Sequence, residues 1–347
     1  MSTASAVPET WELEGEDAKQ VLRRAGRWKL LKDSFARFRT ADGLSLARAV
    51  AHAAVLAVFP ALITVIGLAS ALHFESFRRV LQNTMQTLAP GPAGQLLREA
   101  FQQSSGAGGA ALVGGVVGVL LSGTFAMAQV ERGCNRIYGM VRDRSLVKKM
   151  VRALVVNVSA GTLFTLAFVI LAAGGAIGDA LNGTAGWNGT ISTVFSIARW
   201  PVGLGLTFAA LTLVYKLSPN RHQPSAGWLQ TGTVVATVLW FGFTALLALY
   251  YSLNSGLGDT YGPLVGIIAL LTWAYATAVA LFLGIAFAAE LEAVRAGVPG
   301  PRTLRRYNEV VVTPEGTEDS PPAVGQSPPA VLRQPEPRIP GGMSATA

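Results

Sequence analysis

Six stretches of the chain are apolar and long enough to cross a membrane. Crossing about 30 Å of hydrocarbon takes roughly 20 helical residues, and each stretch reaches that length. In lipid only structures that close their own backbone hydrogen bonds are stable, so apolar runs of this length predict helices. We therefore predict an all-α polytopic membrane protein with six spans at about 49–72, 106–128, 151–177, 194–217, 227–250 and 262–289.

The composition supports this class and disfavours several others. Of the 347 residues, 51% are hydrophobic and 14% are charged, whereas about 25% are charged in ordinary soluble domains. The single cysteine, Cys134, and the three histidines have no metal-ligand spacing. We therefore predict no metal site, no cofactor and no enzymatic activity.

The chain divides into three predicted regions. Residues 1–46 form a polar N-terminal segment, residues 47–292 hold the six spans, and residues 293–347 form a tail. The tail has ten prolines from residue 299 onward and few large apolar side chains. Such a composition cannot bury enough apolar surface to offset the entropy of folding, so we predict that the tail is disordered.

Basic residues are distributed unevenly about the spans. Near the span ends, 21 Lys and Arg residues lie on one side and 3 on the other. The positive-inside rule then places both termini in the cytoplasm. We therefore predict a multi-pass protein of the inner (plasma) membrane. The net charge of +8 could also suggest a surface that binds nucleic acid. The alternation from loop to loop instead favours a membrane topology, with anionic lipid headgroups as partners at the cytoplasmic face.

Two segments outside the spans carry helical patterns. Residues 18–40 place apolar side chains at helical spacing among basic residues, which predicts an amphipathic helix. It lies in the headgroup layer, packs against the cytoplasmic ends of the bundle, or does both. The first outer loop, at 73–105, shows two amphipathic pieces separated by Pro90-Gly91-Pro92. This pattern predicts a helical hairpin at the outer interface.

Small residues and prolines within the spans suggest where helices meet or bend. Gly114 and Gly118, and likewise Gly262 and Gly266, stand four residues apart, a spacing that lets helix backbones approach closely in lipid. Pro60 lies in the middle of the first span and removes one backbone hydrogen bond, so we expect a kink there. Such a kink serves either gating or structure alone.

Landmarks along most of the chain resemble those of one bacterial family. They run from about residue 20 to 295 and include Phe59-Pro60, Glu131 through Asn135 to Tyr138, Arg199-Trp200-Pro201, Tyr215, Pro219, Trp228, Gly232, Trp240, Tyr251, Tyr261-Gly262, Trp273 and Gly284. In these the chain resembles the YihY/BrkB family of six-helix inner-membrane proteins. Members often carry Glu and Asn shortly after the glycine that matches Gly284, where this chain has Ala286 and Ala288.

The resemblance implies a role in the cell envelope. Our first hypothesis is movement or handling of a lipid or other amphiphile, and the alternative is a non-transporting envelope or scaffold protein. The family's older label as a ribonuclease lacks support from any catalytic motif in this sequence. A hydrophilic cavity open to the side would favour transport, and a solid bundle would favour the scaffold. The oligomeric state remains open, a homo-oligomer included.

Five residues near the end of the second span are candidates for contact with a headgroup. Glu131, Asn135 and Tyr138 are spaced by four and three residues and share one helical face. Arg132 and Arg136 add positive charge beside them. The alternative is that Glu131 and Asn135 only cap and brace the end of the helix.

The topology can be tested by labelling single cysteines in a Cys134→Ser background. We expect an impermeant thiol reagent added outside cells to label cysteines at Gly183 and Asp259, because both positions lie in predicted outer loops. A cysteine at Arg142 should stay unlabelled until the membrane is opened. Labelling of that position from outside would contradict the predicted arrangement.

Overall fold

The structure is a computed structural model, and it describes residues 6–10, 12–71, 108–140, 143–168, 170–171, 189–254, 263–298 and 301. The chain divides into two units, residues 1–302 and 303–347, and all described residues belong to the first. The predicted outer hairpin and nearly all of the predicted disordered tail therefore lie outside the described residues.

Within these ranges the chain forms eight helices and no strand, which confirms the predicted all-α class. Six of the helices are long and apolar enough to cross a membrane. The two short helices are α1 (Gly15–Ala25) and α2 (Arg27–Thr40). The six long helices are α3 (Gly43–Ala71), α6 (Gly108–Ile137), α7 (Leu146–Phe168), α9 (Gly189–Leu217), α10 (Ala226–Leu253) and α12 (Pro263–Arg295).

Several helices extend past the boundaries that hydropathy predicts. α3 begins six residues before the predicted start at 49, α6 ends nine residues after 128, and α12 ends six residues after 289. At 1.5 Å per residue, the 33 residues of α12 are about 50 Å long, more than the hydrocarbon thickness. The extra turns carry polar and charged side chains, so a hydropathy window excludes them although they remain helical.

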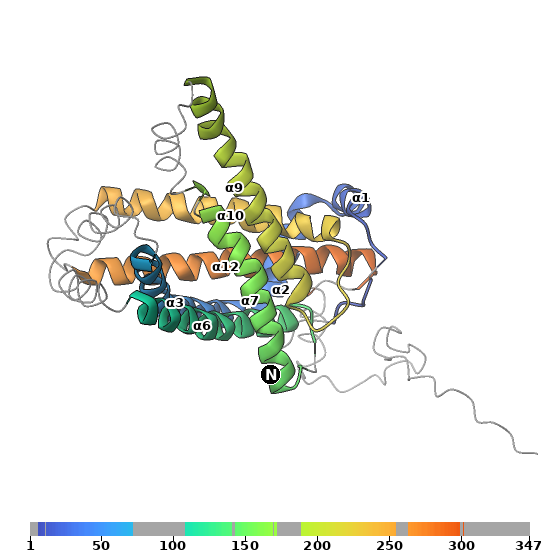
Figure 1. The fold of residues 1–347 in the computed structure, drawn as a ribbon. Coiled ribbons are helices and arrows are strands. Elements are labelled where there is room, and N and C mark those ends of the chain that lie inside the picture. The colour runs from blue at the N-terminus through green and yellow to red at the C-terminus, as the bar shows by residue number, and fades with distance from the viewer. Residues whose placement is uncertain are drawn as a thin grey trace, which may run out of the picture. The chain divides into compact units, whose positions relative to one another are not determined.

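Long helices that follow one another along the chain run antiparallel. α3 packs along α6, α10 packs along α12, and α12 also contacts α3, so these four form one side-by-side group. α7 contacts α6 on one side and α9 on the other, and α9 contacts α10. Figure 1 shows α3, α6, α10 and α12 running side by side, with α7 and α9 crossing them.

The contact between α3 and α6 depends on glycines. A Cβ on Gly118 would come within 2.7 Å of the Pro60 Cβ, and one on Gly115 within 2.6 Å of the Thr64 backbone nitrogen. Pro60 therefore lies at a close helix crossing, beside one of the predicted packing glycines. Among the described residues, nothing lies within 4 Å of the Cβ position of Gly114 or Gly266, so a close contact at either stays a prediction. Gly262 lies outside the described residues.

The contact between α10 and α12 is made by residues that also carry the resemblance to the YihY/BrkB family. Gly232 and Gly284 face each other so closely that a Cβ on Gly232 would come within 2.5 Å of the Gly284 carbonyl oxygen. The Trp240 indole N–H donates to Thr277 (3.2 Å), and the Trp273 indole N–H donates to Thr244 (3.2 Å). Hydrogen bonds between neighbouring helices are a recognised means of association in lipid.

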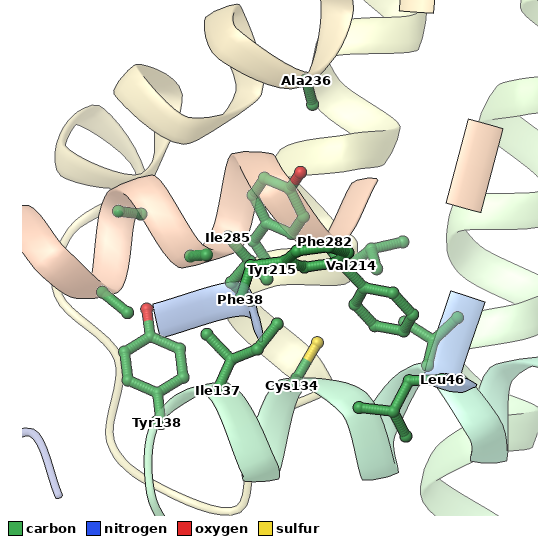
Figure 2. Close-up of a cluster of buried hydrophobic side chains, with 14 of the residues drawn as sticks. Phe38, Leu46, Cys134, Ile137, Tyr138, Val214, Tyr215, Ala236, Phe282 and Ile285 are labelled. Carbon is green, nitrogen blue, oxygen red and sulfur yellow. The ribbon is translucent and has the colours of Figure 1, made fainter. Parts of the chain in front are cut away.

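The main buried cluster lies near one end of this group of helices. There α2, α6, α9 and α12 end and α3, α7 and α10 begin, and we call this the polar end. Figure 2 shows side chains from α2, α6, α9 and α12 meeting in the cluster, among them Phe38, Cys134, Tyr215 and Phe282. The Tyr215 hydroxyl donates to the Leu281 carbonyl across 2.8 Å.

The N-terminal amphipathic segment forms two helices where the sequence suggests one. Gly26 separates α1 from α2 with a φ of 80°, a conformation that glycine adopts without strain. α1 packs on α10, and α2 packs on α12 and α3. The segment therefore packs against the bundle. Contact with the headgroup layer stays a prediction for the side chains that remain exposed.

The glycine contact between α3 and α6 can be tested with a matched pair of substitutions on one helix. We expect Gly118→Ala to lower the free energy of unfolding by about 1–3 kcal/mol, because its methyl group overlaps Pro60. Gly114→Ala should be neutral or stabilising by up to about 1 kcal/mol, since alanine favours helix and nothing obstructs it. Denaturant titration of the detergent-solubilised protein measures both, and equal effects would contradict the contact.

Candidate functional site

Three glutamates are fully buried at the polar end, and each is paired with an arginine. Glu131 lies on α6, and Glu290 and Glu292 lie near the end of α12. Their partners are Arg144, Arg37 and Arg221 respectively, all from segments outside the six spans. Burying a carboxylate costs free energy unless it is paired and hydrogen-bonded. These contacts therefore determine where the segments outside the spans lie. We call the three pairs, together with Asn135 and Asp143, the polar cap.

The first pair attaches α2 to the bundle. The Arg37 Nε donates to Glu290 Oε2 at 2.7 Å, and both side chains are fully buried. The Arg37 Nη1 also donates to the Ile137 carbonyl at 3.3 Å. One guanidinium therefore connects α2 to the last turns of both α12 and α6.

The second pair holds the N-terminal residues and the α9–α10 connection together. Arg221 donates to a carboxylate oxygen of Glu292, and the Thr10 hydroxyl donates to the same oxygen. Arg221 also donates to the Val7 carbonyl at 3.1 Å, and its guanidinium carbon lies 4.6 Å from the centre of the Tyr138 ring. Burial, and then the nearby Glu292 carboxylate, raise the pKa of the Tyr138 phenol, which stays neutral at physiological pH.

The third pair covers the end of α9. Arg144 donates to Glu131 Oε2 at 3.2 Å, to the Ser218 carbonyl at 2.9 Å and to the Pro219 carbonyl at 2.9 Å. Arg152 donates to the Leu217 carbonyl at 3.0 Å. The last carbonyls of a helix have no partner within it, so these arginines satisfy acceptors that would otherwise be buried without one.

Asn135 joins the same region by using both ends of its amide. Its Nδ2 donates to Asp143 at 2.9 Å, and its Oδ1 accepts from the Asn220 backbone N–H at 2.7 Å. Burial alone would raise the pKa of Asp143, but hydrogen bonds from Lys149 and from the Arg144 backbone outweigh it, and the pKa is lowered. Asp143 therefore stays ionised and holds the α6–α7 connection against Asn135.

The glutamates of the cap are only partly satisfied. Each has one oxygen on its arginine, and the other oxygen accepts no hydrogen bond within the described part of the chain. A buried ion pair is favourable only when the remaining lone pairs are also bonded. The cap is thus held by strong individual contacts but does not complete every hydrogen bond.

The structure gathers three of the five predicted contact residues and leaves two outside. Glu131, Asn135 and Tyr138 are buried in or beside the cap, next to protein groups. Arg132 is exposed, and the partly exposed Arg136 lies 3.7 Å from Asp42. The contacts of Glu131 and Asn135 match the bracing alternative. Contact of any of the five with a headgroup stays a prediction.

A second feature lies between α6 and α7, within the spans. It is a groove of about 430 Å³, and we call it the α6–α7 groove. The groove is lined by one amide side chain, that of Asn157. Its Nδ2 donates to the Leu120 carbonyl at 3.4 Å, and the side chain lies against Gly123. Val158 and Leu166 at its edge are about half exposed, so the groove opens to the surroundings of the helices. The lining residues are Val119, Leu120, Asn157, Val158, Gly161, Thr162, Thr165 and Leu166.

The cap and the groove contain no metal-binding arrangement. Among the residues that the structure describes, no three His, Cys, Asp or Glu side chains come together as ligands of one ion would.

Comparison with known proteins gives the family. The profile of the family described as Virulence factor BrkB matches residues 34–306. The chain belongs to the BrkB family. The match confirms the predicted resemblance and covers every residue of the polar cap and all six spans. No solved structure matches the chain.

Two relatives illustrate how this BrkB-family chain compares with others. It is 27% identical over 257 residues to the putative ribonuclease-like protein YfkH of Bacillus subtilis, a match that covers 73% of this chain and 92% of YfkH. It is 27% identical over 113 residues to the UPF0761 membrane protein IL2447 of Idiomarina loihiensis, covering 33% of this chain and 39% of that protein.

The buried pair of α2 and α12 can be tested by a double-mutant cycle. We expect Arg37→Leu to lower the free energy of unfolding by about 3–5 kcal/mol, because Glu290 is left buried without its cation. Adding Glu290→Leu should restore much of that loss. Arg136→Leu is the matched control at the partly exposed pair, where we expect a change within about 1 kcal/mol. A double variant as unstable as the single one would contradict the pairing.

Proposed function

We propose that this BrkB-family protein moves or handles a lipid or other amphiphile of the cell envelope. The observation that carries the proposal is the α6–α7 groove. It lies between two membrane-spanning helices and is open along one side, and its volume of about 430 Å³ is within the range of small-molecule sites. A groove at this depth is reached directly from the bilayer, where amphiphiles are dissolved.

The lining suits a molecule with an apolar chain and a polar group. Val119, Val158 and Leu166 provide apolar walls for an acyl chain. Asn157, Thr162 and Thr165 provide an amide and two hydroxyls at the same place. Asn157 and Thr162 already donate to the backbone carbonyls of Leu120 and Val158. Polar residues within a span nevertheless often mark a substrate path.

The polar cap holds α2, α6 and α12 together at the polar end through its ion pairs. We infer that it faces the cytoplasm of the cell membrane, because the loops predicted to be cytoplasmic provide its arginines. Movement of an amphiphile between leaflets would then require the helices at this end to separate.

A specific observation also favours the non-transporting alternative. Glu131 and Asn135, which a headgroup path would use, bond to groups of the same chain. The groove is also smaller and more apolar than a hydrophilic path for a headgroup. A scaffold whose cap positions N-terminal helices would show these features without transport.

Catalysis by the cap is not part of the proposal. Each of the three buried glutamates is held by an arginine and screened from solvent. A general base must reach the proton of its substrate. The ribonuclease-like name belongs to YfkH, and we propose that the present protein is not an enzyme.

Transport can be tested with fluorescent lipids in proteoliposomes. We expect the wild-type protein to raise the rate at which labelled lipids cross between leaflets. Gly161→Leu should abolish most of that increase, because its side chain fills the groove. Gly242→Leu is a matched control in α10, where no described residue lies within 4 Å of the Cβ position, and it should retain the wild-type rate.

The outcomes separate the two functions. Equal loss in both variants, with lowered thermal stability, would mean that Gly161→Leu acts on folding and not on a path. A wild-type protein that moves no labelled lipid under any ion gradient would contradict transport and favour the scaffold.

A further inference from the structure

α2 exposes a face that the bundle does not cover. The side that faces the bundle carries buried residues such as Leu30, Arg37 and Phe38. On the other side, Trp28 is 77% exposed, Leu31 is 42% exposed and Phe35 is 50% exposed. Together with the exposed Arg27, Lys32 and Arg39, these residues form what we call the outer face of α2.

Aromatic and basic side chains alternate along this face. Trp28, Lys32, Phe35 and Arg39 follow one another at steps of four, three and four residues, which places them in a single stripe of the helix. Every exposed charge on α2 is positive, because its one acidic residue, Asp33, is buried. The face thus combines large apolar groups with an uninterrupted positive charge.

The position of α2 fixes the depth of this face. Only Ala41 and Asp42 separate α2 from α3, and α3 continues from there into the first membrane span. The buried Arg37–Glu290 pair also attaches α2 to α12 near the end of another span. The outer face is therefore held where the spans leave the hydrocarbon, close to the lipid headgroups.

We propose that the outer face of α2 binds the anionic headgroup layer of the membrane. Trp28, Leu31 and Phe35 insert at the boundary between headgroups and acyl chains, where aromatic side chains are favoured. Arg27, Lys32 and Arg39 contact lipid phosphates, and their apolar stems remain over the acyl boundary. Charge complementarity selects this occupant over a neutral surface.

Acidic residues nearby do not cancel the attraction. The exposed Glu12, Glu14 and Glu16 lie before or at the start of α1, on the far side of the Gly26 break. Asp42 at the end of α2 lies 3.7 Å from Arg136. The inference is independent of transport, since a scaffold would use the same anchor.

The proposal can be tested on the full chain in nanodiscs. Single cysteines replace Trp28, Phe35 or Lys29 in a Cys134→Ser background and carry a bimane fluorophore. The nanodiscs contain phosphatidylcholine alone or mixed with phosphatidylglycerol, and a trace of lipid with a nitroxide near the headgroup acts as quencher. Lys29 is the matched control, because it is exposed on the same helix but lies off the stripe.

We expect the nitroxide lipid to quench bimane at positions 28 and 35 several-fold more than at 29, and most strongly in the anionic nanodiscs. Adding Lys32→Glu and Arg39→Glu should remove the dependence on lipid charge while leaving the melting temperature unchanged, since both side chains are exposed. Quenching at 28 and 35 by aqueous iodide, and not by lipid, would overturn the proposal. Shielding from both quenchers would also overturn it and indicate a protein partner on this face.

Discussion

The polar end depends on one constraint: each carboxylate that is buried away from water must be paired with a positive charge. Glu131, Glu290 and Glu292 are buried beyond the reach of solvent, and each needs a cation close by. The cations come from three separate segments outside the spans, so satisfying the glutamates also fixes α2, the α6–α7 connection and the α9–α10 connection. In the described parts of the opposite helix halves, few large side chains are buried, and the open groove lies there between α6 and α7.

The fold followed largely from the sequence because lipid admits few structures. Long apolar runs predict spanning helices, and within the described ranges six helices are long and apolar enough to span a membrane. The boundaries were less accurate, since helices such as α12 continue past the hydrocarbon with charged turns that hydropathy excludes. The break at Gly26 was also missed, because apolar spacing alone continues across it.

The site was less predictable because its contacts are distant in the chain. Glu131, Asn135 and Tyr138 were found from their spacing on one helix, and the position of the glutamates at span ends was visible. No local pattern indicates that Arg37 reaches Glu290 across 253 residues, or that Arg221 reaches Val7. Glycine spacing treats Gly114 and Gly118 alike, and it cannot tell the face of α6 that lies against Pro60 from the face that carries the exposed Gly114.

The separation between Arg37 and Glu290 has a consequence for how the protein is made. A ribosome adding about 5–20 residues per second needs on the order of 10 to 50 s to synthesise the 253 residues between them. During that time α2 has been made but lacks its buried partner, and Arg221 and Thr10 likewise wait for Glu292. The cap can be completed only after the end of α12 has been synthesised. Its closure therefore requires α2, the α6–α7 connection, the α9–α10 connection and the end of α12 to meet at one end of the bundle.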